Sequence, residues 1–179
     1  MTNLFFIAII PSETIAGKII SVQRAVSEKY HSHHALKSPP HITLVPPFKL
    51  KKENENNFAK TLSVFFSGFS SFEIKLNGFS CFGRNRVIFI HVSPNEKLNQ
   101  LYEKLNLEMK NEKQHEQFTP HITIASRDLR KEMFPNAWNE FKEKYFYETW
   151  TAASAHLLQH SGKEWIPILE FKFKQNETH

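Results

Sequence analysis

Cysteine and membrane-length apolar runs are nearly absent from this chain of 179 residues. The one cysteine, Cys81, cannot form an internal disulfide, which weakly favours a reducing compartment. Next to Phe82, Cys81 is better interpreted as a small buried hydrophobic residue than as a nucleophile. The apolar run Leu4–Ile10 is too short to span a bilayer, and it lacks the basic lead and cleavage site of a signal peptide. We therefore expect a cytoplasmic protein with no membrane partner.

Several motifs are also missing. The chain has no GxxxxGK[ST] loop, which argues against a familiar triphosphate-driven enzyme, and no HExxH zinc motif. No stretch resembles a linker, so residues 1–179 are expected to form a single domain built of two halves. With 40% hydrophobic residues and 17 Phe, a chain of this length can bury a sizeable core.

The charge balance is basic, with a formal net charge of +5 and a pI of about 9.3. A basic protein attracts phosphate-bearing partners through its overall field, although the field by itself names no substrate. A solvated basic surface that only aids solubility is the alternative explanation.

The pattern of apolar residues predicts strands and helices in alternation, with a hairpin turn at Gly83–Arg86 between two of the strands. Helices are predicted from a Ser12 cap to Tyr30, over Asn56–Phe66, from a Ser93-Pro94 start through Leu105, and over Lys131–Tyr145 with a delay at Pro135. Strands are predicted at Leu4–Ile10, His41–Val45 (ended by Pro46-Pro47), Phe72–Phe82, Arg86–Val92, Thr119–Ala125, Thr149–Leu158 and Trp165–Phe173. This mixture favours an α+β fold with mainly antiparallel sheets.

One short motif occurs twice, as Pro-His-Ile-Thr followed by an apolar residue. The copies read HITL at His41–Leu44 and HITI at His121–Ile124. Because side chains alternate along a strand, His and Thr share one face while the apolar residues share the other. Each copy can therefore anchor one face in a core and present an imidazole and a hydroxyl on the opposite face.

Two such strands across a cleft would place two histidines and two threonines around one space. This set suits phosphodiester chemistry, because one neutral imidazole can take a proton while a charged one donates a proton to the leaving oxygen. The hydroxyls of Thr43 and Thr123 can donate hydrogen bonds to non-bridging phosphate oxygens. No metal or other cofactor is required. The competing interpretation is a decayed duplication that keeps the pattern for packing alone.

Other residues are weaker candidates. Phe48 and Phe118, at the edges of the two motifs, could each stack a base, although core packing is the better explanation for either taken singly, and Tyr30 is equally ambiguous. The His31, His33 and His34 cluster invites a metal interpretation, which nothing else in the sequence supports. Lys37 could line a cleft entrance, whereas Arg84 and Arg86 are expected to be solvated turn residues. No partner is predicted for His91, His115, His156 or His160.

The duplicated motif resembles the signature of the two-histidine (2H) phosphoesterase superfamily, the group of 2′–5′ RNA ligase-like proteins and cyclic phosphodiesterases. The resemblance covers nearly the whole chain, and it implies two pseudo-symmetric lobes around a central cleft. It implies that His41, Thr43, His121 and Thr123 are catalytic, with His121 as the base and His41 as the acid. A basic residue after the second motif is also found in relatives, so Arg127 is expected either to hold phosphate or to face solvent.

The resemblance implies a hydrolase that acts on a 2′,3′-cyclic phosphate of RNA or of a nucleotide. We expect it to be metal-independent and monomeric. A non-catalytic module that binds RNA ends or nucleotides, and a 2′–5′ ligase-type transesterification, are the alternatives. The first motif continues Val45-Pro46-Pro47-Phe48 instead of the apolar-Leu-Gly stretch of many RNA-end-processing members. This departure leaves the substrate open.

Overall fold

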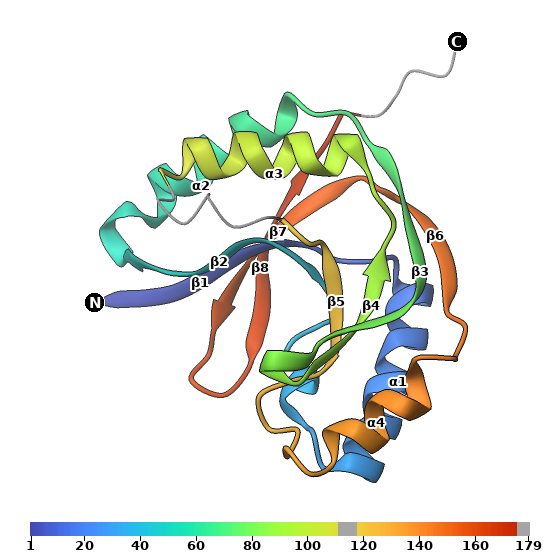
Figure 1. Ribbon diagram of the computed structural model, residues 1–179. Coiled ribbons are helices and arrows are strands. Elements are labelled where there is room, and N and C mark those ends of the chain that lie inside the picture. Colours follow the sequence, from blue (N-terminus) through green and yellow to red (C-terminus); the bar gives the residue numbers. More distant parts are fainter. Residues whose placement is uncertain (111–117, 175–179) are drawn as a thin grey trace.

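The computed structural model describes residues 1–110 and 118–174, and it is an α+β fold with two four-stranded antiparallel sheets (Figure 1). The first sheet has the order β2-β1-β7-β8, and the second has the order β5-β4-β3-β6. The strands are β1 (Thr2–Ile9), β2 (Ile42–Lys51), β3 (Phe72–Phe82), β4 (Val87–Val92), β5 (His121–Ala125), β6 (Tyr147–Ala152), β7 (Ser154–His160) and β8 (Trp165–Lys172).

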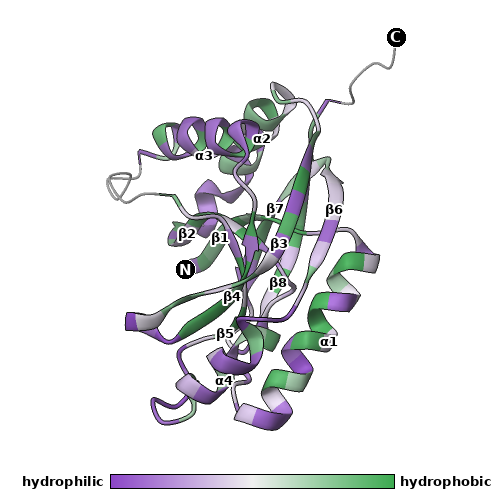
Figure 2. Cartoon of the chain, turned by 45° about the vertical axis from the view of Figure 1, so that its right-hand side comes forward, coloured by the Kyte–Doolittle hydropathy of each residue, from purple (hydrophilic) through white to green (hydrophobic). Residues whose placement is uncertain are grey.

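The described part of the chain forms four α-helices, which are α1 (Glu13–Tyr30), α2 (Glu55–Ser67), α3 (Glu96–Glu108) and α4 (Phe134–Phe141). Hydrophobic residues dominate β4, whereas α3 is mostly hydrophilic and buries only one side, including Leu98, Leu101 and Leu105 (Figure 2). None of the helices in the described residues is long and apolar enough to cross a membrane.

The expected pseudo-symmetry is present in the topology. The unit β1-α1-β2 in the first half corresponds to β4-α3-β5 in the second, and each motif strand is an outer strand of its sheet. The helices are exchanged between the halves, because α1 packs against β5 while α3 packs against β2. The core that joins them contains Ile19 of α1 and Leu101 of α3, both fully buried. Each motif strand is therefore supported by its own sheet and by the helix of the other half.

A β-bulge accompanies both motifs. The pairing register shifts just after the motif threonine, so Leu44 on β2 and Ile124 on β5 each occupy an extra position relative to the neighbouring strand. Both extra residues are fully buried. Bulges of this kind re-aim side chains next to functional sites, and here the same distortion occurs in both lobes.

Most predicted elements are confirmed, but several boundaries were wrong. The helix predicted over Lys131–Tyr145 covers only Phe134–Phe141, and Pro135 lies in its first turn, where proline is tolerated. Strand β2 does not end at Pro46-Pro47, because an edge strand tolerates proline and the prolines coincide with a second register shift. The predicted strand Thr149–Leu158 is two strands, β6 and β7, which belong to different sheets. Helix α3 is capped by Asn95, whose Oδ1 accepts a hydrogen bond from the Leu98 amide at 3.0 Å, rather than by Ser93.

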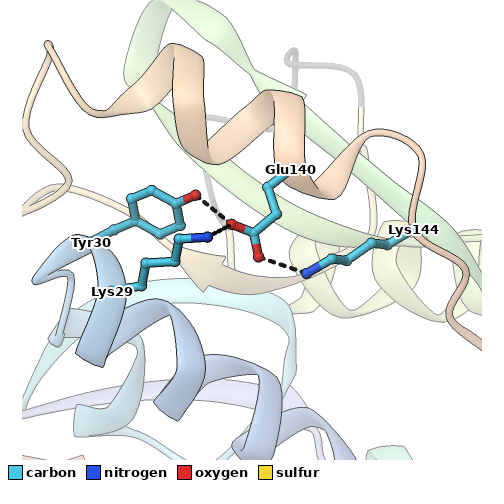
Figure 3. A network of polar contacts seen from close by, with 4 residues as sticks. All are labelled: Lys29, Tyr30, Glu140 and Lys144. Carbon is cyan, nitrogen blue, oxygen red and sulfur yellow. Dashed lines mark hydrogen bonds and ion pairs between the residues drawn. The ribbon is translucent and has the colours of Figure 1, made fainter.

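The C-terminal end of α1 is tied to α4 by a polar network around Glu140 (Figure 3). The Glu140 carboxylate accepts hydrogen bonds from Lys144 at 2.7 Å, from Lys29 at 2.6 Å and from the Tyr30 hydroxyl at 2.5 Å. These donors lower the pKa of Glu140 to about 2. Tyr30 is thus engaged in holding two helices together, which favours a structural role for it.

Candidate functional site

The two motif strands meet where their sheets face each other. Strands β2 and β5 are in contact, and the two motifs show the same alternation of exposure. In each motif the His and Thr side chains are half-buried, while the residues between and after them are fully buried: Ile42 and Leu44 on β2, Ile122 and Ile124 on β5. The predicted presentation of His41, Thr43, His121 and Thr123 on one side of each strand is therefore present.

Both imidazoles are oriented by the same backbone hydrogen bond. The Nδ1 of His41 donates to the Pro39 carbonyl oxygen at 2.8 Å, and the Nδ1 of His121 donates to the Thr119 carbonyl oxygen at 2.7 Å. A carbonyl oxygen only accepts, so each Nδ1 must carry a hydrogen. The Nε2 of each ring is then free to accept a proton, or to donate one when the ring is charged.

Aromatic rings flank both histidines. The Phe6 ring lies 4.7 Å from the His41 ring between centroids, and the rings of Phe89 and Phe82 lie 4.9 and 5.2 Å from His121. These rings fix the imidazoles and exclude water from part of their surface. The sequence contained no signal that would assign these three phenylalanines, among 17, to the site.

Burial shifts both imidazoles toward the neutral form. Burial, opposed in part by the hydrogen bond to Pro39 and reinforced by repulsion from His121, lowers the pKa of His41 to about 4. Burial also lowers the pKa of His121, and its hydrogen bond to Thr119 opposes this shift. Because an uncharged ring is favoured in a poorly hydrated place, both histidines are largely neutral at pH 7 when no ligand is bound.

A pocket of about 210 Å³ opens between the motifs. His41, Thr43, Thr123 and Arg127 line it, so four of the residues selected from the sequence converge there. His121 lies beside the pocket, against Phe82 and Phe89, rather than among the residues that line it. Residues that the sequence did not single out complete the lining: Phe6, Gln23, Ala35, Ser38, Pro40, Pro47, Ser126 and Trp165.

The loop after β5 shapes one wall of this pocket. Arg127 has a φ of 39°, a left-handed backbone conformation that is uncommon for a residue with a side chain. The next residue, Asp128, accepts hydrogen bonds from the backbone amides of His33 and His34 at 2.6 and 2.8 Å and from the Ser32 hydroxyl at 2.8 Å. Asp128 thereby locks the loop after α1 against the loop after β5.

The hydrogen bonds of Asp128 position the loop that carries His33 and His34, and the three histidines of the cluster point to different places. His34 lines the pocket, and burial together with the charge of Arg127 lowers its pKa, while Asp128 opposes that shift. His33 points elsewhere, because its Nδ1 shares a hydrogen bond with the Ser27 hydroxyl. His31 is exposed at the end of α1 with a φ of 55°. Within residues 1–110 and 118–174, no three His, Cys, Asp or Glu side chains are grouped so as to hold a metal ion.

Gln23 of α1 reaches the second motif from the other half of the molecule. Its Nε2 donates to the Thr123 carbonyl oxygen at 2.9 Å, and its side chain is only 2% exposed although it borders the pocket. The corresponding bond in the other half runs from Asn106 Nδ2 on α3 to the Leu44 carbonyl oxygen at 3.0 Å. A single sequence could not reveal this pair, because each bond joins residues more than sixty positions apart.

Two aromatic candidates lie outside the pocket. The ring of Phe48 packs on Phe5 and Phe58, with centroids 6.2 and 5.5 Å away. Phe118 stacks on Tyr102 at 3.8 Å. Both rings are occupied by packing, so we leave Phe48 and Phe118 out of the proposed site.

The remaining candidates are distributed as follows. Arg86 has a φ of 53° in the turn before β4 and donates to the Leu129 carbonyl oxygen at 3.2 Å, and Cys81 is half-buried with a raised pKa caused by burial. His91 of β4 lies opposite His121 of β5. His156 of β7 lies opposite Ala8 of β1, and the His160 ring contacts the Trp165 ring. His115 lies outside the described residues.

Comparison with known proteins identifies the family. The sequence profile of the 2′–5′ RNA ligase superfamily matches residues 11–164, which include both motifs. The chain belongs to the 2′–5′ RNA ligase superfamily. The resemblance drawn from the paired His-Ile-Thr motifs is thereby confirmed.

Bacterial relatives of this superfamily member extend over most of its length. Two carry the name "Putative phosphoesterase": one from Geobacillus kaustophilus, 34% identical over 84% of this chain and 87% of the relative, and one from Geobacillus thermodenitrificans, 31% identical over 96% and 97%. Family and names together indicate an enzyme of the phosphoesterase or RNA-ligase type.

Two solved structures share the fold. TT0787 of Thermus thermophilus matches with a TM-score of 0.68 at 18% identity over 94% of this chain and 97% of that one. LigT of Escherichia coli, in complex with 3′-AMP, matches with a TM-score of 0.68 at 20% identity over 98% and 100%. These matches agree with the α+β architecture of two antiparallel sheets described above.

Proposed function

We propose that this superfamily member is a phosphodiesterase that opens a 2′,3′-cyclic phosphate on RNA or on a nucleotide by two-histidine acid–base catalysis. One observation carries the proposal. In each motif, Nδ1 of the histidine donates to a backbone carbonyl two residues earlier, so that Nε2 is left available on the strand face that it shares with the motif threonine. A packing role would not require the same free nitrogen in both halves.

The reaction needs one proton acceptor and one proton donor. A water molecule attacks phosphorus and gives its proton to the neutral Nε2 of one histidine, while the other histidine protonates the ribose oxygen that leaves. One P–O bond forms and one breaks, and the product is a ribose phosphomonoester with one free hydroxyl. The family resemblance assigns the base to His121 and the acid to His41.

The phosphate itself would be held by the remaining polar lining. Thr43 and Thr123 can each donate a hydroxyl hydrogen bond to a non-bridging oxygen, and Arg127 supplies a full positive charge at the same pocket. His34 adds a fourth donor. These contacts act where charge concentrates as the phosphorus becomes five-coordinate.

The histidine that acts as the acid must gain its proton from solution when the substrate binds. The pKa of His41 is about 4 without a ligand, so this ring is uncharged at pH 7. The negative charge of a bound phosphodiester favours the imidazolium and raises the pKa of a neighbouring histidine. We therefore expect substrate-like anions to bind with uptake of a proton from solution.

Nucleotide ligands are consistent with this assignment. The Escherichia coli relative was solved with 3′-AMP, a ribose phosphomonoester with a free neighbouring hydroxyl, which is the kind of product that opening of a 2′,3′-cyclic phosphate leaves. A further phosphomonoester of this type is the expected product here.

The decisive experiment is incubation of the purified protein with the four nucleoside 2′,3′-cyclic phosphates and with an RNA ending in a cyclic phosphate, in EDTA. Chromatography of the products should show phosphomonoesters with wild type, formed at least about a hundredfold more slowly by His121→Ala. Binding without turnover would replace the proposal with a non-catalytic nucleotide-binding module. Joined RNA ends, formed when a 5′-hydroxyl RNA is added, would instead indicate ligase-type transesterification.

A further inference from the structure

A second pocket, of about 530 Å³, adjoins the pocket between the motifs. The two pockets share Gln23, Ser38 and Trp165, so they form a continuous groove from the motif threonines outward between α1 and the start of β8. We call the outer part the α1–β8 groove. None of the residues that line this groove belongs to the two His-Ile-Thr motifs.

The α1–β8 groove carries two cations. Arg24 of α1 and Lys37, at the end of the loop that Asp128 locks, both line it and are exposed. Neither takes part in the ion pairs found among the described residues. One carboxylate, Glu164, also borders the groove. Two unpaired cations against one acid leave a net positive wall beside the proposed phosphate site.

The charge of Lys37 also acts on His34, which lines the inner pocket. Lys37 contributes to the lowered pKa of His34, after burial and Arg127. Arg127 and Lys37 both favour the neutral form of His34, so two cations act at this pocket, one from its lining and one from the adjoining groove.

Trp165 forms the shared wall of the two pockets. Its ring is held edge-on against Phe6 at 4.7 Å and against His160 at 4.8 Å. The side chain stays half-buried, and two apolar residues at the rim, Leu36 and Ile166, are 37% and 45% exposed. A fixed indole with an apolar rim suits the flat face of a nucleobase.

Gln23 provides an independent sign of a ligand where the two pockets join. Its Nε2 is used by Thr123, and its Oε1 is buried with no hydrogen-bond partner. A buried polar atom without a partner is costly, so its persistence calls for a ligand or water that donates to it. Arg127, Thr43 and Thr123 can all donate to a phosphate, whereas this oxygen can only accept. A ribose hydroxyl or a base amine supplies such a donor.

We propose that the α1–β8 groove binds the nucleoside side of the substrate and that Arg24 and Lys37 select a nucleotide with a further phosphate on its 5′ side. This inference rests on the proposed function and sharpens it. The preferred substrate is the cyclic-phosphate end of an oligonucleotide, or a 5′-phosphorylated nucleoside cyclic phosphate, rather than a nucleoside cyclic phosphate alone.

The first test is a binding measurement that needs no turnover. Calorimetry at low ionic strength compares adenosine 3′,5′-bisphosphate with adenosine 3′-monophosphate. We expect wild type to bind the bisphosphate about tenfold more tightly, because the extra phosphate reaches two cations. Arg24→Ala combined with Lys37→Ala should abolish this preference, because the affinity for the bisphosphate falls much more than the affinity for the monophosphate.

Matched variants separate a local contact from the overall field. Lys60→Ala removes an exposed cation of α2, outside the α1–β8 groove, and should not change the preference. Glu164→Gln removes the opposing charge and should increase the preference. Equal binding of both ligands, no binding of either, or a preference that survives loss of Arg24 and Lys37 would each overturn the inference.

The second test separates the groove from the chemistry. Rates are compared for adenosine 2′,3′-cyclic phosphate, its 5′-phosphorylated form and a dinucleotide with the same end. We expect kcat/KM to rise about tenfold with the added phosphate in wild type but not in the double variant. If the bisphosphate preference is present while no cyclic phosphate reacts, the groove stands and the phosphodiesterase proposal fails. If both phosphate-bearing substrates react no faster than the simple one, the groove fails and the proposed function stands.

Discussion

The two motif strands of this superfamily member are built to one plan and placed in different surroundings. Each places its histidine against a phenylalanine ring, ties Nδ1 to a carbonyl two residues back and bulges after its threonine. Each also receives a side-chain amide hydrogen bond from the helix of the opposite half. The repeated features are those that orient the imidazole and the hydroxyl.

The surroundings differ in charge and in space. The second motif is followed by the Arg127-Asp128 loop, which brings a cation and His34 to the pocket, whereas the first is followed by Pro46-Pro47 on an edge strand. The residue opposite Thr43 on the neighbouring strand is Ala8, while the residue opposite Thr123 is Phe89.

This contrast separates two tasks within one site. The symmetric part orients two histidines in the same way, and these are the groups that the proposed reaction uses for proton transfer. The asymmetric part places charge and shape on one side of the pocket. In the proposed reaction, this one-sided wall would orient the substrate so that only one imidazole faces the leaving oxygen.

The largest expected effect tests whether the two strands act as one pair. His41→Ala and His121→Ala should each lower kcat for a cyclic phosphate by about 10²–10⁴, because each removes one of the two proton-transfer groups. The kcat of the double variant should be only slightly lower than that of the less active single variant, because an acid contributes little once its partner base has been removed. His31→Asn, at an exposed left-handed position, is the control and should retain activity.

Additive losses in the double variant would contradict this comparison. They would show that the two histidines act in separate steps, or that one of them only supports the fold. Circular dichroism of each variant, at the assay temperature, distinguishes the second case.

A smaller expected effect is a dependence of protein stability on pH that comes from the lowered pKa of His41. In the unfolded chain His41 takes a proton near pH 6.5, whereas in the folded protein its pKa is about 4. The unfolded state therefore binds more protons between these values, and the free energy of unfolding should fall by at most about 3 kcal/mol from pH 7 to pH 4. His41→Gln should remove most of this loss, in urea unfolding curves measured at several pH values.

Proton NMR of the imidazoles sharpens the same point. His41 should titrate below His121 in the free protein, and added 3′-AMP should raise the pKa of one or both rings. A His41 signal that titrates normally near pH 6.5 would contradict the burial on which the proposed proton uptake depends.

The smallest effect compares the two helix-to-strand amides. Gln23→Met and Asn106→Leu each leave a motif carbonyl without its donor, and each should cost about 1–2 kcal/mol of unfolding free energy. Only Gln23 also borders the pocket, so Gln23→Met should in addition raise KM while Asn106→Leu leaves KM unchanged. Equal effects on KM would erase the distinction between the symmetric scaffold and the one-sided wall.

Much of this architecture was predictable from the repeat and the apolar pattern. The alternation in His-Ile-Thr determines which side chains face the core, and the helix Glu13–Tyr30 and the strand Phe72–Phe82 follow from local periodicity. Local signals failed where a neighbour decided the outcome. Pro46-Pro47 remains within a strand because that strand lies at a sheet edge, and Ala152 and Ser154 belong to different sheets although they are almost adjacent in sequence.

The sequence by itself determined the two histidines, the two threonines and the face that each presents, because strand geometry alone sets these. Only the tertiary structure decided which further residues join them. Gln23, His34 and Trp165 reach the site from α1, the loop after it and β8, and Asp128 fixes that loop from more than ninety residues away. The physical reason is that a phosphate pocket is built from charges and hydrogen bonds between distant segments, and no local periodicity encodes such contacts.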